Sequence, residues 1–562
     1  MTPESNALIP VGIAAVCFLF AFFYGQRRRA RALRRRVADS FGKVPAEPEQ
    51  PRALTREFWA LLRADEPDGQ CIDDATWDDL DMDGLFARID ICQSAVGRAY
   101  LYAGLHRLRT GPELARRARL AALFATRPAL RLDVQLCLAR LGRKRGQEFA
   151  AFLFDPSPMR LPHGRLYRIC ALLPLLTLPA LFFGPWALCF LAACVVNTAL
   201  YYHAKDKVRA HLDTLGYFSL LLSAAKRLSR LVQADAPALA DALDEAARPL
   251  KAVSGGVGAL ARPSTGEVND LLFELLGALT LMPLLYYDRA VRMMQREHAA
   301  LLRLCMLLGE TELAVATLSF RESLPVCCTP EFSTETALVC NGLYHPLLDE
   351  PVANSAAFRR HTLFTGSNAS GKSTFIKALA VNAVLAQTLG VCAARAFTLP
   401  RTLVVTSMAV ADDLFAGDSY FVAELKSLRR LLTCAQNGTL CLCFIDEILK
   451  GTNTVERIAA SAAVLRHLAA CRCLCFVATH DRELTEMLAN LYENRHFSEQ
   501  VGPGGVTFDY LLKEGPARTR NAIALLAQLG FPADVTHAAE ETASVFEAEG
   551  RWPTAQRPKN IV

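Results

Sequence analysis

The residues that point most directly to chemistry form the stretch GSNASGKST, which runs from Gly366 to Thr374. It fits the pattern GxxxxGK[ST], follows a predicted strand and precedes a predicted helix, which is the setting this motif needs. Glycines let backbone N–H groups turn inward at a helix N-terminus and hold phosphates. We expect Lys372 to reach the β- and γ-phosphates of a nucleotide and the Ser373 hydroxyl to bind Mg²⁺. The predicted nucleotide-binding residues of the loop are Gly366, Ser367, Asn368, Ala369, Ser370, Gly371, Lys372, Ser373 and Thr374.

Two further motifs place acidic and imidazole groups at the ends of predicted strands. CLCFIDE ends in Asp446 and Glu447, and ATH ends in His480. Asp446 is in a position to hold Mg²⁺ through water, and Glu447 to polarise an attacking water as a general base. His480 can contact a γ-phosphate or the same water. A solvated strand end and a structural histidine are the alternatives, but the place of both motifs after Lys372 in one α/β pattern favours catalysis.

The elements that must position these groups follow from the apolar pattern. From residue 331 onward, short apolar runs alternate with helical stretches. Residues 51–160 and 204–330 have apolar side chains at three- and four-residue spacing, which predicts a helical bundle. The predicted fold class is an α/β P-loop nucleotide-binding domain with a mostly parallel sheet, preceded by an all-α region with transmembrane helices. The predicted buried parallel strands are His361–Thr365, Leu403–Met408, Cys441–Ile445 and Leu474–Ala478.

Two uncharged apolar runs predict membrane segments. Ala7–Tyr24 is close to the length that spans a bilayer, and seven arginines follow within residues 27–36, which places that side in the cytoplasm. Ile169–Tyr202 is too long for one span and is interrupted by Gly184-Pro185, so two short helices folded into a hairpin fit better. A cleaved or interfacial segment is the alternative for the first run, and a re-entrant hairpin is the alternative for the second.

Composition indicates where the chain works and what it binds. Hydrophobic residues make up 52% of the 562 residues, and the excess lies in the apolar runs. The net charge is +6, and without the seven clustered arginines it is −1, which counts against strong binding of duplex DNA, because proteins that bind duplex DNA usually carry a broad basic surface. The 18 cysteines form no CxxC pair, and several alternate along predicted strands, which favours buried thiols over disulfides or zinc. We expect the inner or plasma membrane, with the nucleotide-binding domain in the cytoplasm.

Four motifs together resemble the MutS-type ATPases. GSNASGKST, ADDLFAGDSYFVAEL (Ala411–Leu425), DEILKGTNTVERIAASAAVLRHL (Asp446–Leu468) and ATHDREL (Ala478–Leu484) occur in the order and spacing of that family. The resemblance covers residues 335–545. More faintly, Val96–Leu136 is similar to the lever and core region of the family. The resemblance implies an ATPase that uses ATP and Mg²⁺.

The resemblance also implies roles for single residues. Asn368 would bind phosphate, and Ser419 would reach across a dimer interface to the γ-phosphate of the partner, so that ATP joins two subunits. Val352 and Tyr510 fall where the family places contacts to adenine, and the Tyr510 ring is available for stacking. Gly515–Val535 matches the C-terminal dimerisation helices of the family, so a homodimer is expected.

Other features depart from the family. An apolar run and an arginine cluster occupy the N-terminus, where MutS proteins carry the domain that reads mismatches, so mismatch reading by such a domain is not expected. Ser367, Ala369 and Ser370 stand where repair proteins commonly have Pro, Met and Gly. Asp481 follows His480, at a position where an aromatic residue or His is usual in the family. Hydrolysis is compatible with these changes.

The predicted function is a membrane-anchored ATPase in which ATP hydrolysis at a dimer interface drives a clamp-like change, with DNA as one candidate partner. One alternative is a protein of repair or recombination that binds mismatched or branched DNA at the membrane. Another is a transport-related ABC ATPase, although the LSGGQ-type signature is missing. The expected organisation is a transmembrane helix (1–26), a basic linker (27–50), a helical core and lever region (51–165), a transmembrane hairpin (166–204), a clamp-like helical region (205–330), the ATPase domain with dimerisation helices (331–545) and a tail (546–562).

Overall fold

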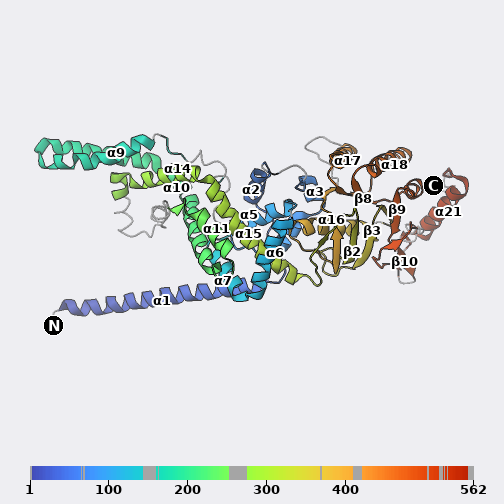
Figure 1. Ribbon diagram of the computed structural model, residues 1–562, viewed down its shortest axis with the longest axis horizontal. Coiled ribbons are helices and arrows are strands. Elements are labelled where there is room, and N and C mark those ends of the chain that lie inside the picture. The colour runs from blue at the N-terminus through green and yellow to red at the C-terminus, as the bar shows by residue number, and fades with distance from the viewer. Residues whose placement is uncertain are drawn as a thin grey trace, which may run out of the picture. The chain divides into compact units, whose positions relative to one another are not determined.

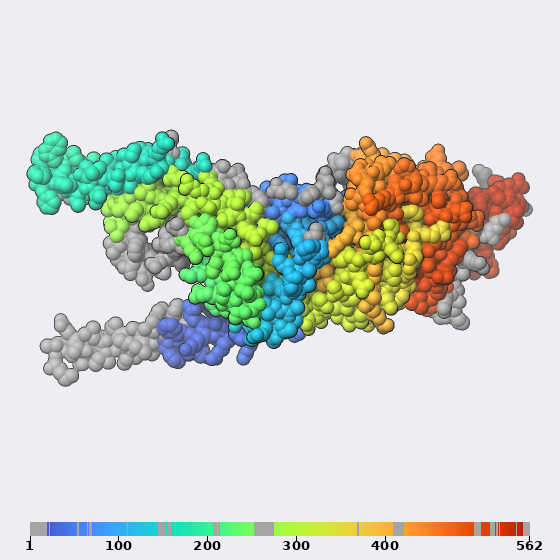
Figure 2. All heavy atoms as spheres, viewed as in Figure 1, coloured from blue at the N-terminus to red at the C-terminus, as the bar shows by residue number. Residues whose placement is uncertain are grey.

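The computed structural model describes residues 3–64, 66, 70–109, 111–143, 153, 160–162, 164–251, 275–367, 370–408, 420–502, 505–517, 523, 526–527 and 529–554. They form two compact units (Figure 1, Figure 2). We name them the helical unit and the sheet unit. The helical unit comprises Met1–Glu66, Phe86–Leu105 and Thr110–Ser323, and the sheet unit comprises Pro67–Leu85, His106–Arg109 and Leu324–Val562.

A six-stranded sheet carries the predicted catalytic groups. Its strand order is β12-β9-β4-β8-β7-β6. The β4–β9, β4–β8, β8–β7 and β7–β6 pairs are parallel, and β12 is antiparallel to β9. Each of the four strands predicted from the sequence is present to within one residue at either end, because continuous apolar runs are typical of strands buried on both faces. The bounds are β4 His361–Thr365, β6 Leu403–Ser407, β7 Cys441–Asp446, β8 Cys473–Ala478, β9 Tyr492–His496 and β12 Lys513–Glu514.

Helices flank this sheet and close its core. The helix α16 (Lys372–Thr388) follows β4, α17 (Tyr420–Gln436) precedes β7, α18 (Thr454–Ala469) joins β7 to β8, and α19 (Arg482–Met487) follows β8. Leu431 of α17 and Leu465 of α18 are fully buried against strand residues that include Cys443 and Cys475. The strand cysteines are buried free thiols, as their alternation predicted.

A second, four-stranded sheet and a hairpin complete the sheet unit among the described residues. The second sheet has the order β1-β5-β2-β3, with β1 parallel to β5 and the other two pairs antiparallel. The strands β10 and β11 form an antiparallel hairpin. The bounds are β1 Glu331–Phe332, β2 Leu338–Leu343, β3 Asn354–Phe358, β5 Ala396–Leu399, β10 Glu499–Gly502 and β11 Gly505–Phe508, and the chain continues to α21 (Ala533–Glu549).

A short segment from early in the chain belongs to the sheet unit. The helix α3 (Asp74–Asp79) packs against β6. There, Asp79 Oδ2 accepts hydrogen bonds from Thr406 Oγ1 at 2.6 Å and from the backbone N–H of Met408 at 3.0 Å. Asp73 also pairs with Arg430 on α17. The helical pattern of residues 51–165 does not reveal that this stretch packs on the sheet, because the contacts join residues more than 300 positions apart.

The helical unit is all-α among its described residues, as predicted. Its central helix α15 is buried along most of its length and carries Glu312, whose Oε2 accepts hydrogen bonds from the backbone N–H groups of Gln93 at 2.6 Å and Ser94 at 3.2 Å. Burial raises the pKa of Glu312 to about 7. The helices are α1 (Pro3–Ser40), α2 (Ala53–Arg63), α5 (Ala95–His106), α6 (Gly111–Thr126), α7 (Pro128–Leu138), α9 (Gly164–Thr177), α10 (Ala187–Val232), α11 (Pro237–Ala247), α14 (Met282–Arg296) and α15 (His298–Ser323), and α4 (Met82–Ile89) ends in this unit.

The N-terminal apolar run and the arginine cluster form one helix, α1. The predicted basic linker at residues 27–50 is therefore helical as far as Ser40, because Arg, Ala and Leu are good helix formers. The helix stops just before Gly42, whose φ of +70° is typical of a helix C-terminus. Near this end, Arg34 pairs with Asp133 of α7 at 3.5 Å. The membrane role of the apolar run stays a prediction.

The second apolar run forms a helical hairpin, as predicted. α9 and α10 pack along each other and are joined through two short 3₁₀ turns, Leu178–Phe182 and Gly184–Trp186 (Figure 1). Gly184, with φ +53°, lies at the reversal. α10 continues to Val232, beyond the predicted end of the hairpin at residue 204, because its sequence contains no proline to stop it. Figure 2 shows the end of the hairpin extending beyond α14, the helix that packs beside it.

Within the described residues, one segment, Gly184–Lys205, is long and apolar enough to cross a membrane. Only 17% of its apolar window is buried in the protein, which separates it from an ordinary core helix. Its neighbours on both arms are also exposed and apolar. The most exposed are Leu175, Leu176, Phe182, Phe183, Trp186 and Leu188, each at least 66% exposed.

Candidate active site

The loop between β4 and α16 uses glycine where the backbone demands it. Gly366 has φ +138°, and a Cβ atom there would lie 2.6 Å from the carbonyl oxygen of Phe497. Gly371 has φ +97° and immediately precedes α16. Ser370 closes the loop, because its Oγ donates a hydrogen bond to the carbonyl oxygen of Ser367 at 2.7 Å. The loop therefore makes a tight turn onto a helix N-terminus, the geometry that favours an anion.

Lys372, the first residue of α16, lies inside this loop and is 2% exposed. Its Nζ donates hydrogen bonds to the carbonyl oxygens of Gly366 at 2.6 Å and Ser367 at 2.7 Å, and it lies 3.5 Å from His480 Nε2. Burial lowers the pKa of Lys372 to about 8, although the nearby carboxylate of Glu447 favours the charged form. An entering phosphate would replace two bonds from the ammonium group to neutral carbonyl oxygens with bonds to an anion, which are stronger.

Glu447 lies between His480 and Lys450 just beyond β7. Its Oε1 is 3.0 Å from His480 Nε2, and its Oε2 is 2.7 Å from Lys450 Nζ. The hydrogen bond with His480 and the pairing with Lys450 lower the pKa of Glu447 to about 2. Its backbone has φ +59°, a region that non-glycine residues seldom adopt, and its N–H donates to Ala478 O at 3.0 Å. Backbone strain of this kind concentrates at functional sites, which supports a role for this carboxylate.

The predicted Mg²⁺ ligands, Asp446 and Ser373, have the chemistry that the ion needs. Asp446 ends β7, and its Oδ1 is buried without a hydrogen-bond partner among the described residues. Ser373 is half-buried on the first turn of α16, next to Lys372. Carboxylate and hydroxyl oxygens suit Mg²⁺, which keeps several of its waters when protein ligands bind it. The residues therefore fit the ion, which Ser373 would bind directly and Asp446 through water.

A cavity of about 300 Å³ opens beside the loop. Val352 and Tyr510, the predicted adenine contacts, both line it, together with Gly371 and Thr374 at the start of α16. This size is at the lower end of small-molecule sites and suits a single aromatic base. The rest of the lining is mostly apolar and consists of Leu343, Tyr344, His345, Leu348, Glu350, Pro351, Asn354, Phe375, Ala378 and Phe497.

Two polar residues shape this cavity. Asn354 fixes the segment that carries Tyr510, because its Nδ2 donates to Tyr510 O at 2.9 Å and its Oδ1 accepts from the backbone N–H of Leu512 at 2.8 Å. Burial lowers the pKa of His345 to about 4. His345 is therefore neutral near pH 7, and it can meet a neutral ring without an unpaired charge.

One comparison with known families bears on this arrangement. Residues 362–547 match the family model for MutS domain V. MutS domain V is the C-terminal ATPase domain of the MutS family. The match includes the loop with Lys372, the acidic pair Asp446 and Glu447, and His480, whereas Val352 precedes it. It confirms the resemblance for that part of the chain, and the fainter likeness at Val96–Leu136 stays a prediction.

The contacts of Asp481 give a physical reason for a carboxylate at this position, where MutS-type ATPases usually have an aromatic residue or His. Arg457 on α18 contacts both carboxylate oxygens of Asp481, with Nη2 at 2.6 Å from Oδ1 and Nε at 3.1 Å from Oδ2. Asp481 directly follows His480, and its backbone N–H donates to Thr479 Oγ1 at 3.0 Å. A bidentate arginine pair fixes geometry as well as charge. We infer that Asp481 positions His480 against Glu447.

Replacing Asp481 with Asn should lower kcat for ATP hydrolysis about 10- to 100-fold, because small displacements of a catalytic group have effects of that size. The Kd for ATP should change by less than about threefold, since Asp481 contacts none of the loop residues through its side chain. Steady-state kinetics and a binding titration separate the two effects. Glu514→Gln is the matched control, because it removes the pairing of an exposed carboxylate with Arg495 in the same unit. An unchanged kcat in the Asp481 variant would contradict the positioning role.

The affinity for ATP should fall as the pH rises above about 8. The pKa of Lys372 is about 8 in the free protein. A bound phosphate favours the ammonium form and raises that pKa, so binding takes up a proton between the two values. The Kd should therefore increase about tenfold per pH unit in this range, and a fluorescent ATP analogue can measure it. Lys372→Arg stays charged throughout and should give a flat profile. An equal fall in both proteins would exclude Lys372 as the cause.

Three predicted residues, Asn368, Ala369 and Ser419, lie outside the described residues, and their roles stay predictions. The structure brings Lys372, Glu447 and His480 together. It also adds residues that sequence reasoning missed. One is Glu499, whose Oε2 accepts a hydrogen bond from Ser367 Oγ at 3.0 Å, and the others are Asn354, Lys450 and Arg457. The recognised motifs give none of these four residues a role. Only their contacts in the folded structure identify them.

Proposed function

We propose that this chain is an ATPase whose MutS-like segment binds ATP with Mg²⁺ and hydrolyses it. One observation carries the proposal: within the matched residues, Lys372 Nζ lies 3.5 Å from His480 Nε2, which lies 3.0 Å from Glu447 Oε1. An ammonium group, a histidine and a carboxylate thus meet at a helix N-terminus, beyond the carboxyl ends of parallel strands. Phosphoryl transfer to water uses a cation that holds the phosphates and a residue that positions or deprotonates the attacking water, and these groups can supply both.

The residues would divide the work of hydrolysis. Lys372 and the backbone N–H groups of the loop would hold the phosphates. Glu447, kept ionised by His480 and Lys450, would accept the proton of the attacking water, and His480 would orient that water or contact the γ-phosphate. Mg²⁺ would neutralise charge that develops on the phosphate oxygens.

The proposal includes a homodimer with two composite sites, supported by the resemblance that assigns Ser419 to the γ-phosphate of the partner. The test uses the full chain in lipid nanodiscs, with hydrolysis, nucleotide binding and particle mass measured on one sample. ATP should be hydrolysed, and it should shift the mass from one protein copy to two. Failure to bind nucleotide would overturn the ATPase. Hydrolysis by a single copy would overturn only the composite sites.

We also propose that the α9–α10 hairpin enters a bilayer and holds the ATPase at the cytoplasmic face of the cell membrane. The support is the row of exposed apolar side chains at its end, including Phe182 at 85%, Leu188 at 70% and Trp186 at 66% exposed. Exposed apolar side chains contiguous over two helices are costly in water and mark membrane or partner contacts. Basic residues on both sides of the hairpin, Arg168 and Lys205, favour the cytoplasm for both ends.

The reactivity of the Cys189 thiol tests directly whether the hairpin lies in a bilayer. It is exposed on the first turn of α10. A water-soluble charged maleimide should modify it at least about tenfold more slowly in nanodiscs than in detergent after delipidation, because the charged reagent does not enter hydrocarbon. Peptide mass spectrometry reads each cysteine separately. Cys471, half-exposed in the sheet unit, is the internal control and should react alike in both media. Fast modification of Cys189 in nanodiscs would place the hairpin outside the bilayer.

The second candidate function is binding of branched or mismatched DNA, and the match to a MutS domain favours it. The measurement is binding of the full chain to homoduplex, mismatched and branched DNA, with and without ATP, across a salt series. Structure-selective binding that ATP changes would make this chain a DNA clamp. Absence of binding at low salt, where phosphate contacts are strongest, would remove the candidate and leave a protein or membrane partner for the ATPase.

A further inference from the structure

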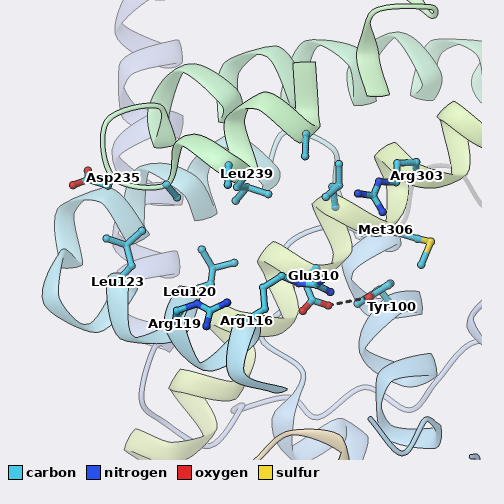
Figure 3. Close-up of a pocket in the computed structure, with 14 residues that line it drawn as sticks. Tyr100, Arg116, Arg119, Leu120, Leu123, Asp235, Leu239, Arg303, Met306 and Glu310 are labelled. Atoms are coloured by element: carbon cyan, nitrogen blue, oxygen red, sulfur yellow. Dashed lines mark hydrogen bonds between the residues drawn. The ribbon is translucent and has the colours of Figure 1, made fainter. Parts of the chain in front are cut away.

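A second cavity, of about 450 Å³, lies in the helical unit, outside everything that the ATPase proposal uses. It is enclosed by α6, the turn before α11, α11 itself and α15, with Tyr100 of α5 at one end (Figure 3). Leu120 and Leu239 point toward each other across it. Its wall is largely hydrocarbon, formed by Leu120, Leu123, Ala236, Ala238, Leu239, Ala242, Met306 and Leu307.

Three arginines border this hydrocarbon wall. Arg116 and Arg119 lie one helical turn apart on α6, and Arg303 lies on α15. All three side chains are exposed at the edge of the cavity. Among the described residues, neither Arg119 nor Arg303 has an ion-pair or hydrogen-bond partner. The cavity therefore combines an apolar interior with guanidinium groups that are available to an external anion.

The two carboxylates in the lining offset these arginines only in part, because each also has a closer partner, although Glu310 is near enough to Arg116 for the arginine to help lower its pKa. Glu310 accepts a hydrogen bond from Tyr100 Oη at 2.9 Å and pairs with the buried Arg117 at 3.4 Å. Asp235 pairs with Arg127 at 3.2 Å. Neither Arg117 nor Arg127 lines the cavity. The lining, with three arginines and two carboxylates, therefore stays net positive, and Arg119 and Arg303 carry the charge that is open to a ligand.

We propose that this cavity binds one hydrocarbon chain of an anionic amphiphile, with the carboxylate or phosphate of the amphiphile at the arginines and the chain between α6, α11 and α15. Arginine forms bidentate pairs with carboxylates and phosphates, which gives the head group its orientation. Each methylene group buried against the leucines adds affinity, whereas a sugar or a nucleoside would leave its polar groups unpaired there. The ligand is a free long-chain fatty acid or one acyl chain of an anionic phospholipid. The inference does not depend on ATP hydrolysis.

Photo-crosslinking of the full chain in phosphatidylcholine nanodiscs tests this proposal. The probe in one arm is palmitic acid with a diazirine near its methyl end, and in the other arm it is phosphatidylglycerol with the same diazirine on one acyl chain. Peptide mapping should find the label near Leu123, Leu239 or Met306. Excess oleate should remove it, and oleyl alcohol, which lacks the charge, should not. Label from the first arm identifies a free fatty acid, and label from the second identifies a membrane lipid. If neither probe labels the cavity, the proposal is overturned.

Variants separate the head-group contact from the chain contact. The double variant Arg119→Ala with Arg303→Ala should weaken the competition by oleate about 25-fold, because each exposed arginine–anion pair contributes about fivefold in affinity. Ala242→Trp should fill the cavity and abolish labelling. The control Arg230→Ala removes an exposed arginine of α10 that does not line the cavity, and it should label normally. Thermal unfolding and ATP binding show that each variant is folded. Normal labelling of the folded Ala242→Trp variant would overturn the proposal.

Discussion

Replacing Glu447 with Gln is expected to lower the rate of ATP hydrolysis about 10²- to 10³-fold, which is the usual contribution of a general base. In the unmodified chain, His480 Nε2 lies 3.0 Å from Glu447 Oε1. The amide of Gln has the same size and can still accept a hydrogen bond from His480, but it cannot take a proton from water. The Kd for ATP should stay within about threefold, because the phosphate contacts belong to the loop. Single-turnover hydrolysis and a nucleotide titration on the full chain measure the two quantities.

The outcome also reports on the dimer. If ATP joins two subunits, the Glu447→Gln variant should keep the ATP-bound dimer populated, because the step that breaks it is blocked. Glu486→Gln is the matched control, since Glu486 is an exposed carboxylate on α19, and it should behave as the unmodified chain does. Hydrolysis that stays above about a tenth of the original rate would assign the proton to another group. Loss of binding instead of hydrolysis would make Glu447 a structural residue.

Replacing Lys372 with Met is expected to raise the Kd for ATP by at least about 100-fold, because two or more charge-assisted hydrogen bonds to phosphate are lost, at about 1.5–3 kcal/mol each. Hydrolysis would disappear at ordinary ATP concentrations. Met has a similar length and carries no charge. The variant therefore loses the hydrogen bonds to Gly366 and Ser367, but it also avoids the cost of burying an ammonium group at this 2% exposed position. A fluorescent nucleotide titration gives the Kd.

Stability must be followed in the same experiment, since Lys372 is buried at the start of α16. A thermal unfolding midpoint close to that of the unmodified chain shows that the loop variant is folded. Lys426→Met, an exposed Lys→Met change on α17, should leave the Kd unchanged. ATP binding of ordinary strength in the folded Lys372 variant would mean that the loop does not hold phosphates through this residue, and the proposed site would have to be abandoned.

Much of the sheet was predictable from the chain itself. His361–Thr365 has the same bounds as β4, and the runs around Cys441 and Leu474 differ from β7 and β8 by one residue. Continuous apolar stretches bounded by turns have few alternatives to a buried strand when helices alternate with them. The reversal of the second apolar run at Gly184 was predictable for the same kind of reason, because a long uncharged helix with a Gly-Pro break cannot continue.

Helix ends and long-range polar contacts were less predictable. α1 continues through the arginines to Ser40, and α10 to Val232, because charged residues are compatible with a helix and only tertiary packing or a breaker ends it. The packing of α3 on β6 through Asp79 joins segments far apart in the chain. No periodicity encodes such a pair.

The sequence by itself determined which atoms could do chemistry: the loop from Gly366 to Thr374, the acids Asp446 and Glu447, and His480, since their types and spacing follow from the local geometry of a strand, a turn and a helix. The tertiary structure decided how those groups are held. It brought Glu447 next to His480 and Lys450, and Arg457 into contact with Asp481. It also placed Val352 and Tyr510 in the lining of one cavity. The physical reason is that a motif is a local backbone property, whereas a pKa, a hydrogen bond or a cavity depends on which distant side chains the fold brings within contact distance.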